Sequence, residues 1–357
     1  SFLVLPDRIL IVRIGWLLFD YQIVSTTRLE LRNLVQGWHG KIQGYSRDLI
    51  VNDLGNIVEE DRQILENRRI SQELSQLLKI DLLLTDLPKR IKCISIVPDD
   101  ILHGFPFAII PHKGKYLIKE YAISIAYESQ YRTRPKPSSS KIQSLLVGIS
   151  KGIPPLDNVK SEIEKATNWM KRYQLNPLPL TDVDTNIDKQ TVINNLSQAT
   201  FFHIACHGFF NHSQPDLSGF ILASNPNQPD EILSLRELLA LKLEKLVHAT
   251  LSSCWSADHF VLPGRWIVSL PETLWRAGTG SILGCLWTVD DKVAESFMTH
   301  FYEYLEEYPR DKALQLTQQK FLDLQGNLSN PIYWAGFTLY GNYKKLDLVS
   351  VKRLRYE

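Results

Sequence analysis

The sequence has few cysteines, no excess of either charge and no long hydrophobic run. Four cysteines in 357 residues, none in Cys-x-x-Cys spacing, argue against a disulfide framework and favour a reducing, cytoplasmic setting. Lys and Arg number 40 against 39 Asp and Glu, so charge gives no reason to expect binding to nucleic acid or an anionic membrane. The longest apolar stretch, at 8–19, is interrupted by Arg13 and Gly15 and falls short of the roughly 20 residues of a membrane helix. It also lacks the cleavage site of a secretory leader.

Three familiar motifs are missing as well. The stretch GTGSILG at 278–284 enters a strand pattern and does not open a helix, so it is no dinucleotide-binding fingerprint. The stretch HKGK at 112–115 is no phosphate-binding loop, and no Gly-x-Ser-x-Gly supports a serine hydrolase. We therefore expect no cofactor.

What is present is enough apolar sequence, 44%, for one large or two medium domains. The stretch RTRPKPSSSK, with two prolines and three consecutive serines, is typical of a linker. It divides the chain into an N-terminal α/β region at 1–134, a linker at 135–141, a second domain at 142–345 and a tail at 346–357. Because the chain begins with Ser1 and not Met, we expect it to be a fragment of a longer protein.

The first region mixes strand and helix patterns. Alternating β-branched and aromatic residues predict a hairpin over 8–25, and apolar residues at helical spacing predict helices within 31–42 and 70–78. Short apolar runs predict strands within 91–97 and 116–127.

The second domain alternates strands with helices. Strands are predicted within 142–150, 200–208, 248–256, 279–289 and 334–343, the last one closing the sheet. Helices are predicted within 157–173, 188–198, 269–278 and 290–305. Their capping residues are Asp157 or Asn158 for the first, Ser269 with Glu272 for the third, and Asp290 or Asp291 for the fourth. Such alternation predicts a three-layer α/β/α sandwich with a mostly parallel central sheet.

Reactive side chains follow two of these strands. In open parallel sheets, catalytic groups gather beyond the carboxyl ends of the strands. His207 follows one strand and Cys254 another, 47 residues later (254 − 207). An imidazole can take the proton of a cysteine thiol, and the amide beside Gly208 can stabilise an oxyanion. We therefore predict that His207 and Cys254 form a catalytic pair.

Two other interpretations of these residues remain. Cys254 could be a small buried residue and His207 a structural histidine. Alternatively, His203, Cys206, His207 and His212 could surround zinc. Because side chains alternate along a strand, a compact cluster of these four would have to break the strand, and we predict no metal site. Cys206 is then expected in the core, and His203 in the core or in support of the site.

The second domain resembles the CHAT domain, a caspase-like family of clan CD that is related to separase and the caspases and is often fused to tetratricopeptide repeats. The resemblance rests on FFHIACHG, ATLSSCWS, LPETLWRAGTGSILGCLWTVDD, FMTHFYEYL followed by ALQLTQQ, and NPIYWAGFTLYGN, in the family's order. The stretch from CISIVPDD to IAYES resembles the segment that precedes the catalytic half in this family. It implies that the first region is a degenerate caspase-like half without a catalytic pair.

The resemblance implies a cysteine endopeptidase with His207 as base and Cys254 as nucleophile. The N–H groups of Gly208 and Cys254 would form the oxyanion hole, and no acidic third residue is required. Protein or peptide substrates are implied, with control by upstream tetratricopeptide repeats or a regulatory protein. Ser253 stands where the family commonly has Ala, and the residues after Cys254 also depart from the family, which leaves substrate preference open.

Relatives in the clan bind the residue before the scissile bond in a charged pocket. The acidic candidates here are Asp258, Asp290 and Asp291, which favour cleavage after a basic residue. Helix capping is the alternative role for Asp290 and Asp291. For the whole protein, the alternatives to a peptidase are a non-catalytic caspase-like scaffold and an acyl transferase that uses the same pair.

Overall fold

A computed structural model describes most of the chain. The described residues are 1–15, 18–37, 68–127, 142–152, 154–182, 187–209, 211, 213–225, 228–253, 259–262, 266–324 and 326–346. The predicted linker at 135–141 and all but the first residue of the predicted tail lie outside them.

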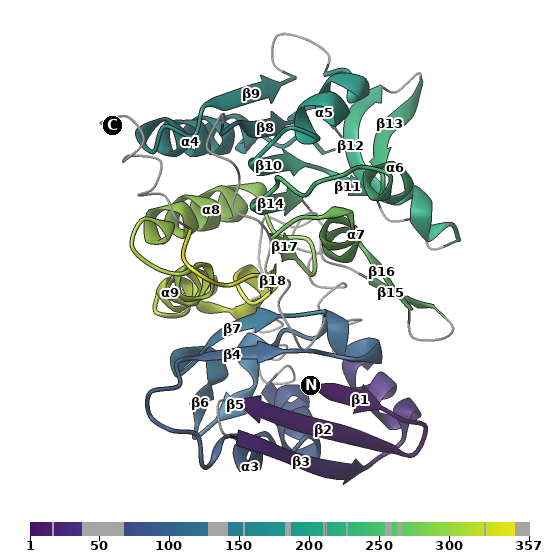
Figure 1. The fold of residues 1–357 in the computed structure, drawn as a ribbon, viewed down its shortest axis with the longest axis vertical. Coiled ribbons are helices and arrows are strands. Elements are labelled where there is room, and N and C mark those ends of the chain that lie inside the picture. The colour runs from purple at the N-terminus through teal and green to yellow at the C-terminus, as the bar shows by residue number, and fades with distance from the viewer. Residues whose placement is uncertain are drawn as a thin grey trace.

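An eight-stranded sheet forms the centre of the molecule (Figure 1). Its order is β4 (Cys93–Ile96), β7 (Ala122–Ile125), β18 (Phe337–Gly341), β17 (Ser281–Cys285), β14 (His248–Ser253), β10 (Phe201–Cys206), β8 (Ser144–Gly148) and β9 (Pro177–Thr181). All neighbouring strands run parallel except β17 and β18. The predicted mostly parallel sheet is therefore confirmed, as two parallel blocks joined by one antiparallel pair.

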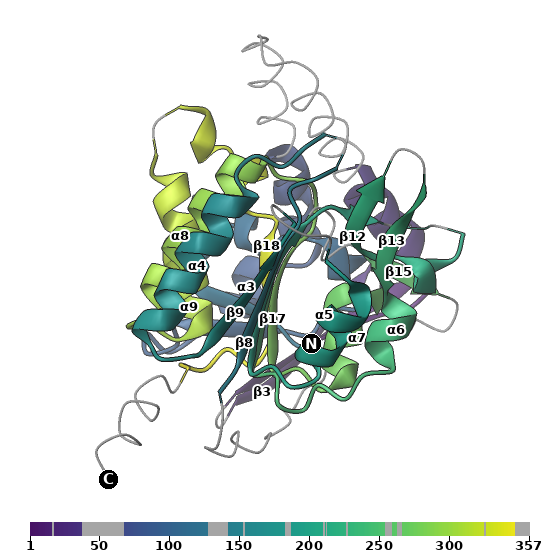
Figure 2. The same ribbon diagram turned by 90° about the horizontal axis from the view of Figure 1, so that it is seen from above.

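Helices cover both faces of this sheet (Figure 2). On one face lie α4 (Val159–Arg172), α8 (Asp291–Leu305) and α9 (Arg310–Leu322), and on the other α5 (Lys189–Leu196), α6 (Leu235–Leu239) and α7 (Leu270–Ala277). Each predicted helix of the second domain has its counterpart here, and the three-layer α/β/α prediction is confirmed. Trp287, Trp334, Phe202 and Phe297 are among the largest fully buried side chains of the core.

The helix-end signals act mostly as the sequence predicts. Ser269 Oγ accepts from the N–H of Glu272 at 3.2 Å at the start of α7, and Gly278 ends the helix at φ 127°, where a Cβ would be strained. Asn158 does occupy the N-cap position of α4, but its side chain makes no capping bond. It donates to Asp291 at 3.1 Å instead, because α8 lies against the start of α4.

Strand β18 differs from its prediction, because it lies inside the sheet and does not close it. It pairs with β17 on one side and with β7 on the other. The predicted strand at 116–127 is also broken into β6 (Lys115–Tyr116), a 3-10 turn at Leu117–Lys119, and β7. The turn persists because the side-chain amides of Gln315 and Gln319 on α9 both donate to the carbonyl of Ile118, each at 2.7 Å.

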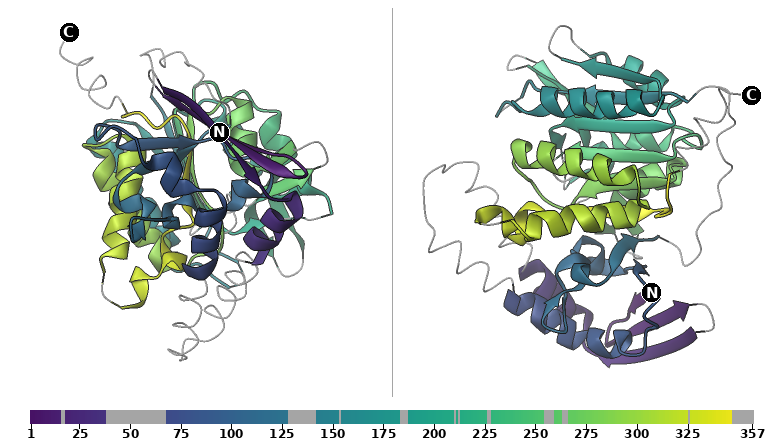
Figure 3. Two further views of the ribbon diagram at one scale, coloured as in Figure 1. Left: turned by 90° about the horizontal axis from the view of Figure 1, so that it is seen from below. Right: turned by 90° about the vertical axis from the view of Figure 1, so that its left-hand side faces the viewer.

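The N-terminal residues form a separate antiparallel sheet of β1 (Phe2–Val4), β2 (Arg8–Gly15) and β3 (Leu18–Ser25), so the predicted hairpin is confirmed. Its inner face is buried against helices at 28–37 and 68–77 and against α3 (Ile80–Leu84). Figure 3 shows this layer beside the end of the central sheet that β4 forms. The outer face carries exposed apolar side chains: Leu3, Ile14, Phe19, Tyr21 and Ile23.

The remaining strands form three small antiparallel sheets. They are β5 (Pro111–His112), which pairs with β6, then β11 (Gly208–Phe209), β12 (Gly219–Asn225) and β13 (Gln228–Ser234), and finally β15 (His259–Leu262) and β16 (Trp266–Ser269). Further 3-10 turns lie at Asp100–Gly104, Phe107–Ile109, Pro215–Leu217, Asn327–Ser329 and Pro331–Tyr333. Within the described ranges, none of the helices combines the length and hydropathy that a bilayer crossing requires.

Candidate active site

The register of β10 against β14 relates the two residues of the predicted catalytic pair. The strands run parallel, and their last residues, Cys206 and Ser253, are register partners 47 positions apart (253 − 206). His207 is the next residue after β10, and Cys254 is the next residue in the sequence after β14. The carboxyl ends of these two parallel strands lie side by side at the same edge of the sheet. Cys254 lies outside the described residues, as do Asp258 and His212.

The imidazole of His207 is oriented by a main-chain carbonyl. Its Nε2 lies 2.7 Å from the carbonyl oxygen of Pro154, in the turn that follows β8. A carbonyl can only accept, so Nε2 carries the proton and donates it. In the neutral ring Nδ1 is then the unprotonated nitrogen, and it is free to act as a base.

Gly152 leaves room for this ring. A Cβ at position 152 would lie 2.5 Å from His207 Cδ2 and 2.9 Å from Nε2. Both distances are well below van der Waals contact, so any larger residue would displace the imidazole. The turn after β8 therefore contributes both the carbonyl that orients His207 and the space that the ring occupies.

The amide of Gly208 points away from its neighbouring strand. The N–H of Ile221 on β12 donates to the carbonyl of His207 at 3.0 Å, and Gly208 pairs with Phe220. In an antiparallel ladder this pattern makes Gly208 and Phe220 a non-hydrogen-bonded pair. The N–H of Gly208 is therefore not used by β12, as an oxyanion donor requires.

The other reactive residues of FFHIACHG lie in the core. His203 is fully buried, with Nδ1 2.8 Å from the Tyr302 hydroxyl and Nε2 2.9 Å from Glu162 Oε1. Tyr302 in turn donates to Thr250 Oγ1 at 3.1 Å, and burial raises the pKa of its hydroxyl. Cys206 is 1% exposed. No group of His, Cys, Asp and Glu side chains suited to a metal occurs in the part of the chain that the structure describes.

Both described aspartates of the predicted specificity site have structural partners. Asp290 caps α8, where its Oδ1 accepts from the N–H of Lys292 at 3.0 Å and of Val293 at 3.2 Å, in agreement with the capping alternative. Asp291 accepts from the N–H and the side-chain amide of Asn158 at 2.8 and 3.1 Å. A role of either carboxylate in substrate binding stays a prediction.

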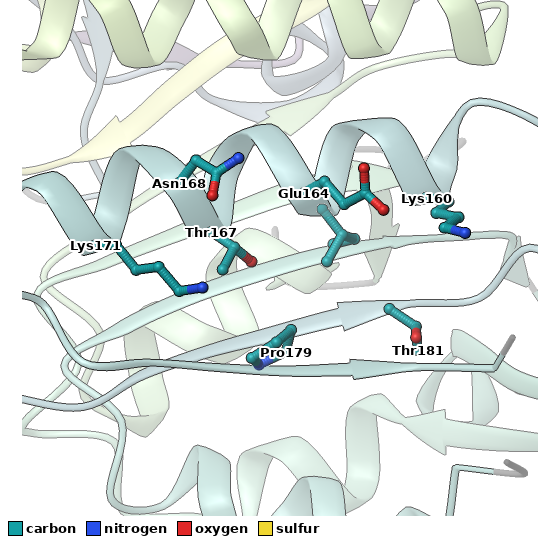
Figure 4. Close-up of a pocket in the computed structure, with 8 residues that line it drawn as sticks. Lys160, Glu164, Thr167, Asn168, Lys171, Pro179 and Thr181 are labelled. Carbon is teal, nitrogen blue, oxygen red and sulfur yellow. The ribbon is translucent and has the colours of Figure 1, made fainter. Parts of the chain in front are cut away.

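Three cavities are lined partly by α4, and two of them can be compared with the predicted site. A small one of about 30 Å³ lies where β10, β14 and β17 end, and its lining includes Cys206, Ser253, Cys285 and the predicted site residue Asp291. It has room for about one water molecule, not for a substrate side chain. A larger one of about 460 Å³ lies between α4 and β9. Figure 4 shows Thr167 directed toward the strand that carries Pro179 and Thr181, and none of the predicted site residues lines this cavity.

This fold, with a histidine and a cysteine position beyond adjacent strand ends, defines a caspase-like α/β protein. A family model described as the CHAT domain matches residues 68–342, which is more than half of the chain. The chain therefore belongs to the CHAT domain family.

Solved structures of the caspase-like clan are similar in fold. Gingipain R, described as an Arg-specific cysteine proteinase, has a TM-score of 0.53 at 12% identity and covers 78% of this chain and 68% of its own. Separase in the separase–securin complex of Saccharomyces cerevisiae has a TM-score of 0.46 at 14% identity, over 68% of this chain. The chain spans only 15% of that separase chain. The Drosophila initiator caspase Dronc has a TM-score of 0.38 at 8% identity, over 62% of this chain and 91% of its own.

At 12% identity, the similarity to gingipain R shows the fold alone, and no curated protein sequence matches the chain. The family match at 68–342 spans the predicted linker, and β4 and β7 extend the same sheet as the second domain. The division at 135–141, and the degenerate caspase-like character of the first region, stay predictions.

Sequence reasoning missed the turn after β8. Gly152 and Pro154 hold His207, yet the stretch SKGIPP carries no reactive side chain. A signal was present, because a glycine and two prolines lie within seven residues of the end of a buried parallel strand (155 − 148). Such strand ends form the edge of the sheet where ligands bind.

Proposed function

We propose that this chain is a cysteine endopeptidase in which His207 and Cys254 act together. The observation that supports the proposal is the register of Cys206 with Ser253, the residues that directly precede His207 and Cys254 in the sequence. The Pro154 carbonyl, which holds His207 with Nδ1 unprotonated, supports the assignment of His207 as the base.

The proposed reaction follows from these positions. Nδ1 of His207 takes the thiol proton, and the thiolate of Cys254 attacks the peptide carbonyl carbon. The N–H groups of Gly208 and Cys254 stabilise the resulting oxyanion. As the C–N bond breaks, the imidazolium protonates the leaving amine, and water then hydrolyses the thioester with His207 again acting as base.

We further propose protein substrates cut after Lys or Arg, with Asp258, Asp290 and Asp291 as the candidate acidic residues. Gingipain R, which shares the fold, is described as Arg-specific, and this points in the same direction. Among the three, Asp258 is favoured, because the other two carboxylates already accept two hydrogen bonds each. Asp290 accepts from the first turn of α8, and Asp291 accepts from Asn158 at the start of α4.

The test is cleavage of a proteome-derived peptide pool, with new termini read by mass spectrometry. Wild type is expected to cut after Lys and Arg, and Cys254→Ala and His207→Ala are expected to leave the pool intact. Cuts only after Asp would refute the basic preference. Equal cleavage by all three proteins would refute the peptidase, and no cleavage by any would favour the caspase-like scaffold.

Control by upstream tetratricopeptide repeats, in a cytoplasmic setting, is the remaining part of the proposal. The exposed apolar face of β1, β2 and β3 supports it, because a protein partner would remove this surface from water. Backbone amides of Phe19 and Ile23 are expected to exchange hydrogen more slowly in the native polypeptide than in residues 1–357 alone. Equal exchange rates would contradict docking on this face.

A further inference from the structure

A buried carboxylate holds the turn that orients His207. Asp182 directly follows β9, is 4% exposed, and takes no part in the proposed reaction. Its Oδ1 accepts from the N–H of Ser150 at 2.9 Å and from Ser150 Oγ at 2.8 Å, and its Oδ2 accepts from the N–H of Lys151 at 2.7 Å. A carboxylate that accepts three bonds from one short segment fixes both the position and the direction of that segment.

The bonded segment is the beginning of the turn that contacts His207. The N–H of Leu156 donates to the carbonyl of Ser150 at 3.0 Å and so closes the turn over residues 150–156. Inside it, Gly152 lies against the imidazole and the Pro154 carbonyl accepts from Nε2. Asp182 is itself fixed, since its N–H donates to Gly148 at the end of β8 at 3.2 Å.

We propose that Asp182 is a positioning residue for His207, acting through the turn at 150–156. By holding Ser150 and Lys151, it keeps the Pro154 carbonyl on Nε2 and thereby keeps Nδ1 as the unprotonated nitrogen. This inference rests on the proposed function for its catalytic meaning. The orientation of the ring can be measured without any activity.

Asp182→Asn is the direct test. The amide replaces one acceptor oxygen by a donor, which cannot accept from the N–H of Lys151 or Ser150, so the turn loosens. We expect kcat/KM to fall about 10- to 100-fold. This is the range typical when a residue that orients a metal-ligating histidine is removed, and Asp182 is proposed to orient a histidine in a comparable way.

The matched control is Asp188→Asn. Asp188 also accepts from a backbone N–H and a hydroxyl, those of Thr191 at 2.8 and 2.9 Å, but at the start of α5. We expect this variant to lose some thermal stability and to keep the wild-type kcat/KM. Ser150→Ala, which removes only the hydroxyl contact to Asp182, should lower kcat/KM by a smaller factor than Asp182→Asn.

Nitrogen-15 NMR of the imidazoles separates this inference from the peptidase proposal. The His207 signals are assigned by their loss in His207→Gln, among nine histidines. Wild type should show the Nε2–H tautomer, and Asp182→Asn a mixture of tautomers, whether or not the protein cleaves peptides. Wild-type tautomer signals in Asp182→Asn would overturn the positioning role. If that variant does not fold, unchanged signals in Ser150→Ala would overturn it.

Discussion

Alanine at Cys254 or at His207 is expected to lower kcat/KM by about 10⁴- to 10⁶-fold, the range seen when a nucleophile or its base is removed. The two residues act as one unit, so the double variant should be no less active than either single variant. An ordinary cysteine thiol has a pKa of about 8.5, so His207→Ala should regain part of its reactivity toward electrophiles near pH 9. The measurement is peptide hydrolysis, together with thiol alkylation followed against pH.

Cys93 is the matched cysteine for this experiment. It lies on β4, far along the sheet from β14, and burial raises the pKa of its thiol. Cys93→Ala should therefore retain wild-type activity. If the fold-loss of kcat/KM in the double variant equalled the product of the fold-losses in Cys254→Ala and His207→Ala, the two residues would act independently. That result would contradict a catalytic pair.

Gly152→Ala is expected to lower kcat/KM about 100-fold with a much smaller change in thermal stability. The new methyl group would lie 2.5 Å from His207 Cδ2, so the imidazole must move by a sizeable fraction of an ångström or lose its bond to Pro154. A displacement of about 1 Å at a catalytic group costs on the order of 10²-fold in rate. Steady-state kinetics and a thermal melt on the same preparation measure the two effects.

The control for this substitution is Gly37→Ala, at the end of the helix at 28–37. A Cβ at Gly37 meets no atom within 4 Å, so the same chemical change should leave activity unaltered. Full activity of Gly152→Ala would show that the orientation of His207 seen here is not the one that matters for catalysis.

The elements of the second domain could be predicted from sequence because their signals are local. Ser269 with Glu272 marked the start of α7, Gly278 marked its end, and the apolar run at 201–206 is β10. The pairing of β18 could not be predicted. The strand is buried on both faces, so its sequence pattern does not indicate which strands lie on either side of it.

The site was predictable only where reactive side chains follow a strand. His207 and Gly208 could be singled out, because an imidazole and a glycine stand directly after buried β10. Asp182 and Pro154 could not be singled out, because their contacts involve main-chain groups and residues far apart in the sequence. Asp182 accepts from the N–H groups of Ser150 and Lys151, and the carbonyl of Pro154 accepts from His207. Glu162, the buried partner of His203, looked like any acidic residue of an amphipathic helix.

The central claim is that His207 activates the thiol of Cys254, and covalent labelling tests it most directly. The protein is treated at pH 7 with a peptide electrophile that carries Arg before its reactive group, and the label is located by peptide mapping. We predict one label per chain, on Cys254 and not on Cys93, Cys206 or Cys285, and a rate that falls at least 100-fold in His207→Ala. Equal labelling of wild type and His207→Ala, or no labelling of Cys254, would contradict the account.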